Sequence, residues 1–277
     1  MTDDIHQEKQ YLSIIEKILA DGSMEEGRNG QTISTFGEMM RFSLKDGTIP
    51  IFTTKKVAWK TCLKELLWFI SGDTNNKTLT DQGVHIWDEN CPPDTTDLGP
   101  IYGHQWRHFN APYKTDKKGI DQLQYVIDKL KDPRERYSRR IIMSAWNPEQ
   151  LDQMALPPCH ILCQFNVSGN KLSCSLYQRS GDMGLGVPFN VASYSFLTHL
   201  LAAHCGLVAH EFVHFLGNAH IYMNHIDALS EQIKRSPFSF PSVSIRTIRD
   251  SINDYVLDDF IVNDYTSHET IKMKMTK

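Results

Sequence analysis

The segment that most constrains the fold is 191–205, which is apolar on nearly every side when it is drawn as a helix. The segment ends at Gly206, and glycine commonly terminates helices. A helix that is apolar all round has to be covered on every face by other parts of the protein. We therefore predict a buried central helix with the remaining elements arranged around it.

The chain is large enough to bury such a helix. It has 277 residues, of which 40% are hydrophobic and 10% aromatic, a composition that excludes a disordered chain. No repeat, low-complexity run or linker rich in Pro, Gly or Ser divides it, so we predict one domain over residues 1–277. The formal charge of −4 implies no general attraction to nucleic acid or to anionic membranes.

Hydrophobic periodicity predicts further helices and several strands. Helices are expected over 5–19, Trp59–Ile70 and Ile120–Lys131. Strands are expected over Thr32–Leu44, Arg140–Trp146, His160–Val167 and Lys171–Gln178, with a hairpin turn at Ser168-Gly169-Asn170. The elements do not alternate as regular βαβ units, so we predict the α+β class. Residues 247–277 are expected to form peripheral strands and a tail.

Neither the N-terminus nor the apolar runs indicate a membrane protein. Runs such as Phe196–Ala203 are far shorter than the roughly 20 residues that span a bilayer. The N-terminus is acidic and polar, unlike a signal peptide, so we expect a cytoplasmic protein. The six cysteines lack paired CxxC spacing and are expected to be reduced thiols.

Cys159 is the thiol with the best sequence context for chemistry. It follows Pro157-Pro158 and precedes a predicted strand, so we expect its position to be rigid. A lone cysteine is more often a small buried hydrophobe. Arg179, however, ends the hairpin strand, and a guanidinium near a thiol favours the reactive thiolate. The pair indicates a nucleophile that faces an anionic substrate.

Two further segments are candidates for ligand contacts. Arg139-Arg140 opens an apolar strand, and this pair is equally compatible with a solvated strand end. The loop from Gly184 to Asn190 has glycines that would let a ligand approach the backbone and an amide that could contact it. Alone, this loop is a weak motif.

Several ordered motifs resemble the thymidylate synthase family. They are Glu65–Phe69, Asp97–Gly103 with Gln105-Trp106-Arg107, Ser138–Ile142, Met154–His160, Leu176–Asn190 and Ala219–His225. The similarity extends from about residue 10 to the C-terminus in the family's order. Matches of this length and order are highly specific.

The resemblance implies an enzyme that converts dUMP and 5,10-methylenetetrahydrofolate to dTMP and dihydrofolate, with no metal. It also implies a mixed β-sheet packed with helices, with one sheet face forming a homodimer interface. Cys159 would add to C6 of the uracil, and Glu65, Tyr102 and His160 would organise proton transfers.

The resemblance also implies which residues bind the two small molecules. The dUMP phosphate would contact Arg28, Arg179 and Ser180, and would receive the Arg139-Arg140 pair from across the dimer interface. Asn190, which is also placed among the catalytic residues, would bind the uracil, and His220 and Tyr222 would bind the ribose 3′-hydroxyl. Trp87, Asp182 and Gly186 would contact the folate.

The chain departs from the family's usual pattern at several places. The first phosphate loop is one residue shorter and reads Gly27–Thr32. Asn218 stands where the family usually has Asp, and Tyr265–Glu269 lacks the family's prolines. The C-terminus ends in Met275-Thr276-Lys277 rather than in two small apolar residues. The residues essential to the chemistry are all present.

Two other functions are less well supported. Residues 210–220 match HExxHxxGxxH, in which three histidines bind zinc and a glutamate activates water. The resemblance already accounts for His214, Gly217 and His220, and Phe212–Leu216 and Ala219–Met223 are predicted to be paired strands flanking a Gly-Asn turn. We therefore expect no zinc site. An RNA-binding or catalytically silent homologue gains no support, because the sequence has no basic stripe.

Overall fold

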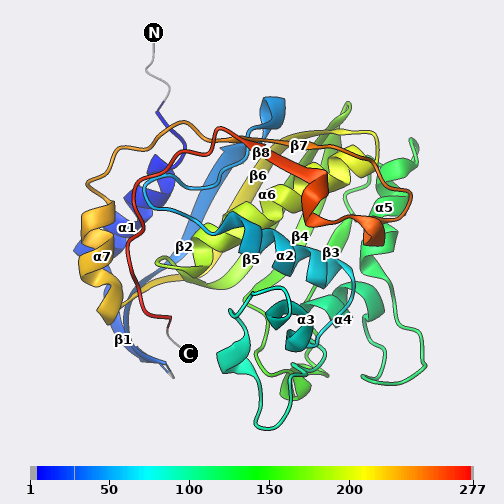
Figure 1. The fold of residues 1–277 in the computed structure, drawn as a ribbon, viewed down its shortest axis with the longest axis horizontal. Helices are drawn as coiled ribbons and strands as arrows, with labels where there is room; N and C mark the ends of the chain where they lie inside the picture. Colours follow the sequence, from blue (N-terminus) through cyan, green and yellow to red (C-terminus); the bar gives the residue numbers. More distant parts are fainter. Residues whose placement is uncertain (1–4, 28, 276–277) are drawn as a thin grey trace.

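Helix α6 (Gly186–His204) lies at the centre of the fold, as predicted, and 15 of its 19 residues are buried. The computed structural model describes residues 5–27 and 29–275 of the chain. Figure 1 shows α6 crossing the face of the main sheet, and it also packs against helix α2 (Trp59–Ile70). The helix starts at Gly186 rather than at Val191, because Pro188 is tolerated in a first helical turn.

The main sheet has six strands in the order β1-β2-β6-β5-β4-β3. Their bounds are β1 (Ser23–Gly27), β2 (Gly30–Ser43), β3 (Ile142–Ser144), β4 (His160–Ser168), β5 (Lys171–Asp182) and β6 (Val208–Tyr222). All neighbours are antiparallel except β5 and β6, which are parallel and are joined by α6. The predicted mixed sheet packed with helices is therefore confirmed, and so is the β4–β5 hairpin.

Within residues 5–27 and 29–275, six other helices surround the sheet and α6. They are α1 (Lys9–Asp21), α2 (Trp59–Ile70), α3 (Asn76–Thr80), α4 (Tyr102–His108), α5 (Gln122–Lys131) and α7 (Ile226–Gln232). Short 3-10 turns occupy Lys45–Gly47, Asp88–Asn90, Leu151–Gln153, Met223–His225, Ile252–Asp254 and Leu257–Asp259. The periodic helices α1, α2 and α5 match the prediction within a few residues. In the described residues, no helix is long and apolar enough to cross a membrane.

A small second sheet lies beside the C-terminal half of α6. Strands β7 (Ser242–Ile245) and β8 (Phe260–Asn263) pair antiparallel in it, and β7 packs on α6. After β8 the chain forms no further helix or strand up to residue 275. Figure 1 shows this last segment, in red, returning along α7 toward the lower end of the molecule. We call residues 264–275 the tail.

Two strand predictions are corrected. Strand β3 covers only Ile142–Ser144, and Arg139 and Arg140 lie before it as exposed residues. Strand β6 runs without a turn through Gly217-Asn218, because β2 and β5 pair with it on both sides. Gly217 serves close approach here, since a Cβ would lie 2.8 Å from the Arg179 carbonyl oxygen. The match to the zinc motif therefore lies on a strand.

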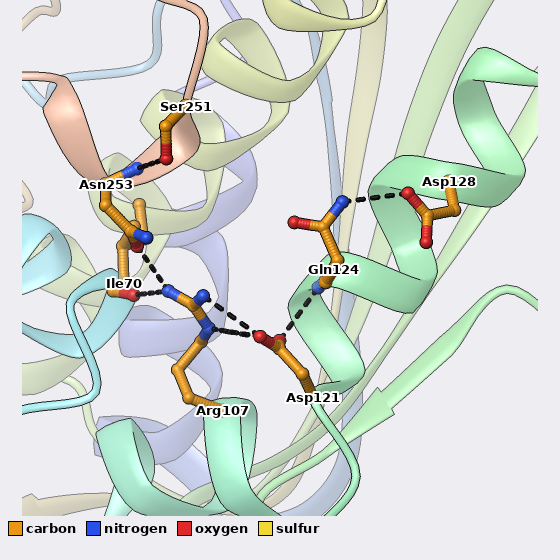
Figure 2. A network of polar contacts seen from close by, with 7 residues as sticks. All are labelled: Ile70, Arg107, Asp121, Gln124, Asp128, Ser251 and Asn253. Atoms are coloured by element: carbon orange, nitrogen blue, oxygen red, sulfur yellow. Dashed lines mark hydrogen bonds and ion pairs between the residues drawn. The ribbon is translucent and has the colours of Figure 1, made fainter.

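Arg107, on α4, links three helices and the 3-10 turn at Ile252–Asp254 (Figure 2). Its guanidinium forms a bidentate ion pair with Asp121, which also caps α5 by accepting the Gln124 N–H. The Nη1 group donates to the carbonyl of Ile70, at the end of α2, and to the Asn253 side chain. Arg107 therefore holds α4 against α2 and α5.

The two faces of the main sheet differ in their surroundings. On the inner face, residues such as Met40, Phe42 and Phe212 are fully buried. On the outer face, an apolar row crosses four strands, from Met39 to Phe215, Tyr177 and Leu162, which are neighbours in the strand register. Each of these four side chains is more than a third exposed in the single chain. We call them the outer row.

Candidate active site

A pocket of about 660 Å³ opens at the N-terminal end of α6, where β5 and β6 also end. Predicted site residues that line it are Trp87, Tyr102, Cys159, His160, Arg179, Ser180, Asp182, Gly186, Asn190, His220 and Tyr222. They come from α4, α6, β4, β5 and β6, from the loop before β4 and, for Trp87, from the segment between α3 and α4. The topology thus brings together residues that are far apart in the sequence.

Among the described residues, three predicted site residues do not line this pocket. Glu65 lies behind it on α2, where its carboxylate accepts a hydrogen bond from the Trp87 indole. Arg139 and Arg140 are exposed and do not contribute to the pocket of their own chain. Arg28 lies outside the described residues.

Arg179 holds the loop that carries Cys159. Its Nε donates to the Pro158 carbonyl at 2.8 Å, and its Nη2 donates to the Pro157 carbonyl at 2.9 Å. The same Nη2 lies 3.8 Å from the Cys159 Sγ. A fixed cation at this distance favours the thiolate over the neutral thiol. The predicted pairing of Cys159 with Arg179 is therefore present in the structure.

The backbone of Cys159 is held from the other side by Tyr102. The Cys159 N–H donates to the Tyr102 hydroxyl at 2.8 Å. The Tyr102 ring stacks on the His160 ring, with 4.1 Å between centroids. His160 Nδ1 contacts the Tyr194 hydroxyl at 2.9 Å. Burial lowers the pKa of His160 to about 3, so its imidazole is neutral at physiological pH.

Glu65 and Trp87 form a buried pair at the back of the pocket. The Trp87 Nε1–H donates to Glu65 Oε1 at 2.7 Å. Burial raises the pKa of Glu65 to about 7, although the indole hydrogen bond acts in the opposite direction. The carboxyl group is therefore able to hold or release a proton near neutral pH.

Asp182 ends β5 and shapes the turn into α6. Its carboxylate accepts the N–H groups of Gly184 at 2.8 Å and Leu185 at 3.1 Å. Burial acts to raise the pKa of Asp182, but the neighbouring His225 and the Gly184 N–H outweigh burial and lower it. Gly186 starts α6 and Asn190 follows one turn later, so both lie at the pocket wall.

Alternate residues of β6 point into the pocket on one face of the strand. His220 and Tyr222 lie there with ring centroids 5.2 Å apart. Asn218, on the same face, bonds through its Oδ1 to His220 Nδ1 at 3.0 Å. Burial lowers the pKa of His220. The pair predicted to bind a ribose hydroxyl is thus brought to one wall.

Sequence reasoning missed Gln178, which also lines the pocket. Its side-chain N–H donates to the Ser180 carbonyl at 2.9 Å, and its Oε1 lies 2.9 Å from His214 Nε2. Both side chains are on the buried inner face of the sheet. A polar residue at an inward position of a strand was the available signal, because buried polar groups need partners.

The residues of the zinc motif do not form a metal site. His214 is committed to Gln178, and His220 is bonded to Asn218. The strand also differs from the helix on which such a motif binds zinc. Among residues 5–27 and 29–275, no group of three or more His, Cys, Asp or Glu side chains is placed to hold a metal ion.

The pocket combines a cysteine thiol, Cys159, with a fixed arginine guanidinium, Arg179. The protein-family model described as thymidylate synthase matches residues 9–277. The human thymidylate synthase is 50% identical over 287 residues, which cover 98% of this chain and 91% of the relative. The chain therefore belongs to the thymidylate synthase family, the enzymes that methylate dUMP to dTMP.

Other relatives differ in length. Thymidylate synthase of Saccharomyces cerevisiae is 49% identical, over 98% of this chain and 97% of the relative. The bifunctional dihydrofolate reductase-thymidylate synthase of Zea mays is 49% identical over 99% of this chain but only 56% of its own length. The chain thus spans about half the length of such bifunctional relatives.

Proposed function

We propose that the chain performs this methylation through a covalent adduct between the Cys159 sulfur and C6 of the uracil. The donor is 5,10-methylenetetrahydrofolate, which supplies both the one-carbon unit and a hydride. The observation that carries the proposal is the Cys159 thiol in the pocket, 3.8 Å from the Arg179 guanidinium. An activated thiolate is the nucleophile that conjugate addition requires.

In the proposed reaction the thiolate adds to C6, and the electron pair of the C5–C6 double bond makes C5 nucleophilic. C5 attacks the methylene carbon of the folate, whose bond to N10 breaks with the electron pair going to N10. Loss of the C5 proton and cleavage of the remaining bond between this carbon and N5 give an exocyclic methylene on the pyrimidine. Hydride transfer from the tetrahydrofolate completes the methyl group, and the Cys159 thiolate leaves C6.

The phosphate of dUMP is proposed to bind at Arg179 and Ser180, next to the nucleophile. Two nitrogens of Arg179 already hold the loop carbonyls, so the guanidinium is fixed before the substrate arrives. A guanidinium fork suits a phosphate dianion. Asn190 is proposed to pair with the uracil, and His220 and Tyr222 with the ribose 3′-hydroxyl.

Proton transfers are proposed for Glu65, which lies behind the pocket, together with Tyr102 and His160. Glu65 has a pKa raised to about 7 by burial, so it is suited to exchange a proton with water near the uracil. The stacked rings of Tyr102 and His160 lie beside Cys159, and both are neutral there, because burial raises the pKa of Tyr102 and lowers the pKa of His160. Trp87, Asp182 and Gly186 are proposed to form the folate wall of the pocket.

We also propose a homodimer that forms through the outer face of the sheet. The outer row supports this interface, because monomeric proteins rarely expose a continuous apolar row on a sheet. Arg139 and Arg140 are exposed outside their own pocket. Each pair is proposed to reach the phosphate bound by the other subunit.

Replacement of the nucleophile tests the covalent step. We expect Cys159→Ser to lose essentially all dTMP formation while it still folds and binds dUMP, because the volume is preserved and the hydroxyl is a poor nucleophile here. Dihydrofolate formation can be followed spectrophotometrically, and dUMP binding by calorimetry. Cys205→Ser, at the far end of α6, is the control and should stay active. Full turnover by the Cys159 variant would contradict the proposal.

Mixing of two inactive variants tests the shared site. An Arg139→Ala/Arg140→Ala chain lacks the donated arginines, and a Cys159→Ser chain lacks the nucleophile. Mixed dimers contain one pocket with both an intact cysteine and intact donated arginines, so we expect about half of the normal activity per mixed dimer. Mixed dimers that form but remain inactive would show that the pair does not cross the interface.

A further inference from the structure

His225 connects the tail to the pocket from a fully buried position. It lies in the 3-10 turn directly after the pocket strand β6. Its Nε2 lies 2.7 Å from the Lys274 carbonyl oxygen, within the tail. Its Nδ1 lies 3.7 Å from the Asp182 carboxylate, a distance suited to an ion pair but too long for a hydrogen bond. One imidazole thus faces two acceptors from different parts of the chain.

The surroundings of His225 are built to hold the ring in place. A Cβ on Gly184 would lie 2.6 Å from His225 Nδ1, so only glycine leaves room for the imidazole. The Gly184 N–H donates to Asp182, and the buried Lys55 ammonium donates to the Gly184 carbonyl. The ring therefore packs against a loop that is fixed by charged partners.

Only one protonation state of His225 satisfies both acceptors. A neutral ring has one N–H. If that N–H is on Nε2, the lone pair of Nδ1 faces the Asp182 carboxylate in a buried site. If it is on Nδ1, the lone pair of Nε2 faces the Lys274 carbonyl and the tail loses its bond. The protonated ring donates from Nε2 to the Lys274 carbonyl and places its positive charge 3.7 Å from the Asp182 carboxylate, so it suits both acceptors.

We propose that His225 is a positioning residue that, in its protonated form, fastens the tail at Lys274 and orients the Asp182 carboxylate at the pocket. The titratable groups around the ring are Asp182 on β5, Lys55 before α2, and His220 and Tyr222 on β6. Burial and Lys55 lower the pKa of His225, but Asp182 and the Lys274 carbonyl outweigh them, and the net shift is upward. As the pH rises through this raised pKa, the tail is released.

Limited trypsin digestion of the ligand-free protein tests the fastening. Lys272 and Lys274 are exposed in the tail, and cleavage after either residue requires the tail to leave its site. Intact mass measurements follow the rate at which C-terminal peptides are released. At each pH this rate is divided by the rate at which trypsin cleaves a free peptide with the tail sequence, which corrects for the pH dependence of trypsin itself. We expect the normalised rate to be at least five-fold higher at pH 8.5 than at pH 6.

His225→Gln removes the titration and keeps a side-chain N–H. We expect this variant to release the tail quickly at both pH values, so that the ratio of the normalised cleavage rates at pH 8.5 and pH 6 is near one. His268→Gln is the matched control, because His268 also anchors the tail, through the Ser236 carbonyl, but faces no carboxylate in the structure. It should keep the pH ratio of the unchanged protein. Retention of that ratio by His225→Gln would overturn the proposal.

Asp182→Asn provides a second test that leaves His225 unchanged. Removal of the carboxylate lowers the pKa of the ring, so the release transition should move to lower pH. A transition that stays in place would also overturn the proposal. In assays, His225→Gln should raise KM for the folate more than KM for dUMP, and this expectation alone rests on the proposed function. Digestion of the ligand-free protein is independent of that function, so the two failures are distinguishable.

Discussion

The Glu65 carboxyl group has a buried environment and one neutral hydrogen-bond donor, the Trp87 indole. Burial raises the pKa of Glu65 to about 7 in the folded protein, whereas an unfolded glutamate titrates near 4.3. Between these two values the folded state holds a proton that the unfolded state has lost. Folding stability contributed by this group therefore falls as the pH rises from about 4.5 to 7, and is constant above that range.

Glu65→Gln tests this linkage. The amide preserves the shape and can accept the Trp87 hydrogen bond, but it does not ionise. Relative to the unchanged protein, the variant should gain about 1–3 kcal/mol of unfolding free energy between pH 5 and pH 8. Urea unfolding at both pH values measures the difference, and a difference that does not change with pH would contradict the raised pKa.

At the residue scale, the sequence predicts the proximity of Cys159 and Arg179 better than it predicts the hydrogen bonds around them. The prolines before Cys159 and the arginine after the hairpin strand indicated their pairing, and the structure places them together. The hydrogen bond between Gln178 and His214 was not predictable. Those two residues belong to different strands, and only the parallel register of β5 and β6 makes them neighbours.

At the scale of elements, α4 depends on Arg107 for its position. The side chain is only 12% exposed and makes a bidentate ion pair with Asp121, as Figure 2 shows. Arg107→Lys keeps the charge but loses the planar fork and its extra hydrogen bonds. We expect a loss of about 2–3 kcal/mol of unfolding free energy.

Arg134→Lys is the control for that variant. Arg134 also pairs with an aspartate, Asp132, but its side chain is 89% exposed. An exposed ion pair contributes little, so replacement of Arg134 should leave the unfolding free energy essentially unchanged. Denaturant unfolding of both variants gives the comparison. Equal effects would mean that the Arg107 network does not anchor α4.

Elements with strong local signals were predicted, and those that depend on neighbours were not. Helices α2 and α5 have apolar residues on one face, and the structure has them almost at the predicted bounds. Strand β6 was interpreted as two strands because glycine and asparagine usually mark a turn. Pairing on both sides, which no local pattern reveals, keeps it straight.

For the whole molecule, the outer row determines the expected assembly. Phe215 lies in the middle of this row, between Met39 and Tyr177, and is 43% exposed in the single chain. In a two-fold interface through this row, a charged side chain introduced at position 215 would lie close to the same charged side chain of the other subunit. We therefore expect Phe215→Arg to shift the molar mass from twice 31.8 kDa to 31.8 kDa and to lose activity.

Ile248→Arg is the control for this variant. Ile248 is 55% exposed but lies in a loop outside the main sheet. The same charge placed there should leave the dimer intact. Light scattering after size-exclusion chromatography measures both variants. A Phe215→Arg protein that remains dimeric would place the interface elsewhere.

The pairing of β2 with β6 has a consequence for how the enzyme is made. Thr32 pairs with Tyr222 and Ser43 with Glu211, so the two strands are separated by more than half of the chain. Closing so long a loop is slow, and proteins rich in such contacts fold slowly. During synthesis, the wall that carries His220 and Tyr222 emerges long after the strand beside it. A ribosome-bound chain that ends before β6 therefore contains Cys159 but no complete pocket, and the edge of its β2 strand remains unpaired until a chaperone binds it or the rest of the protein is made.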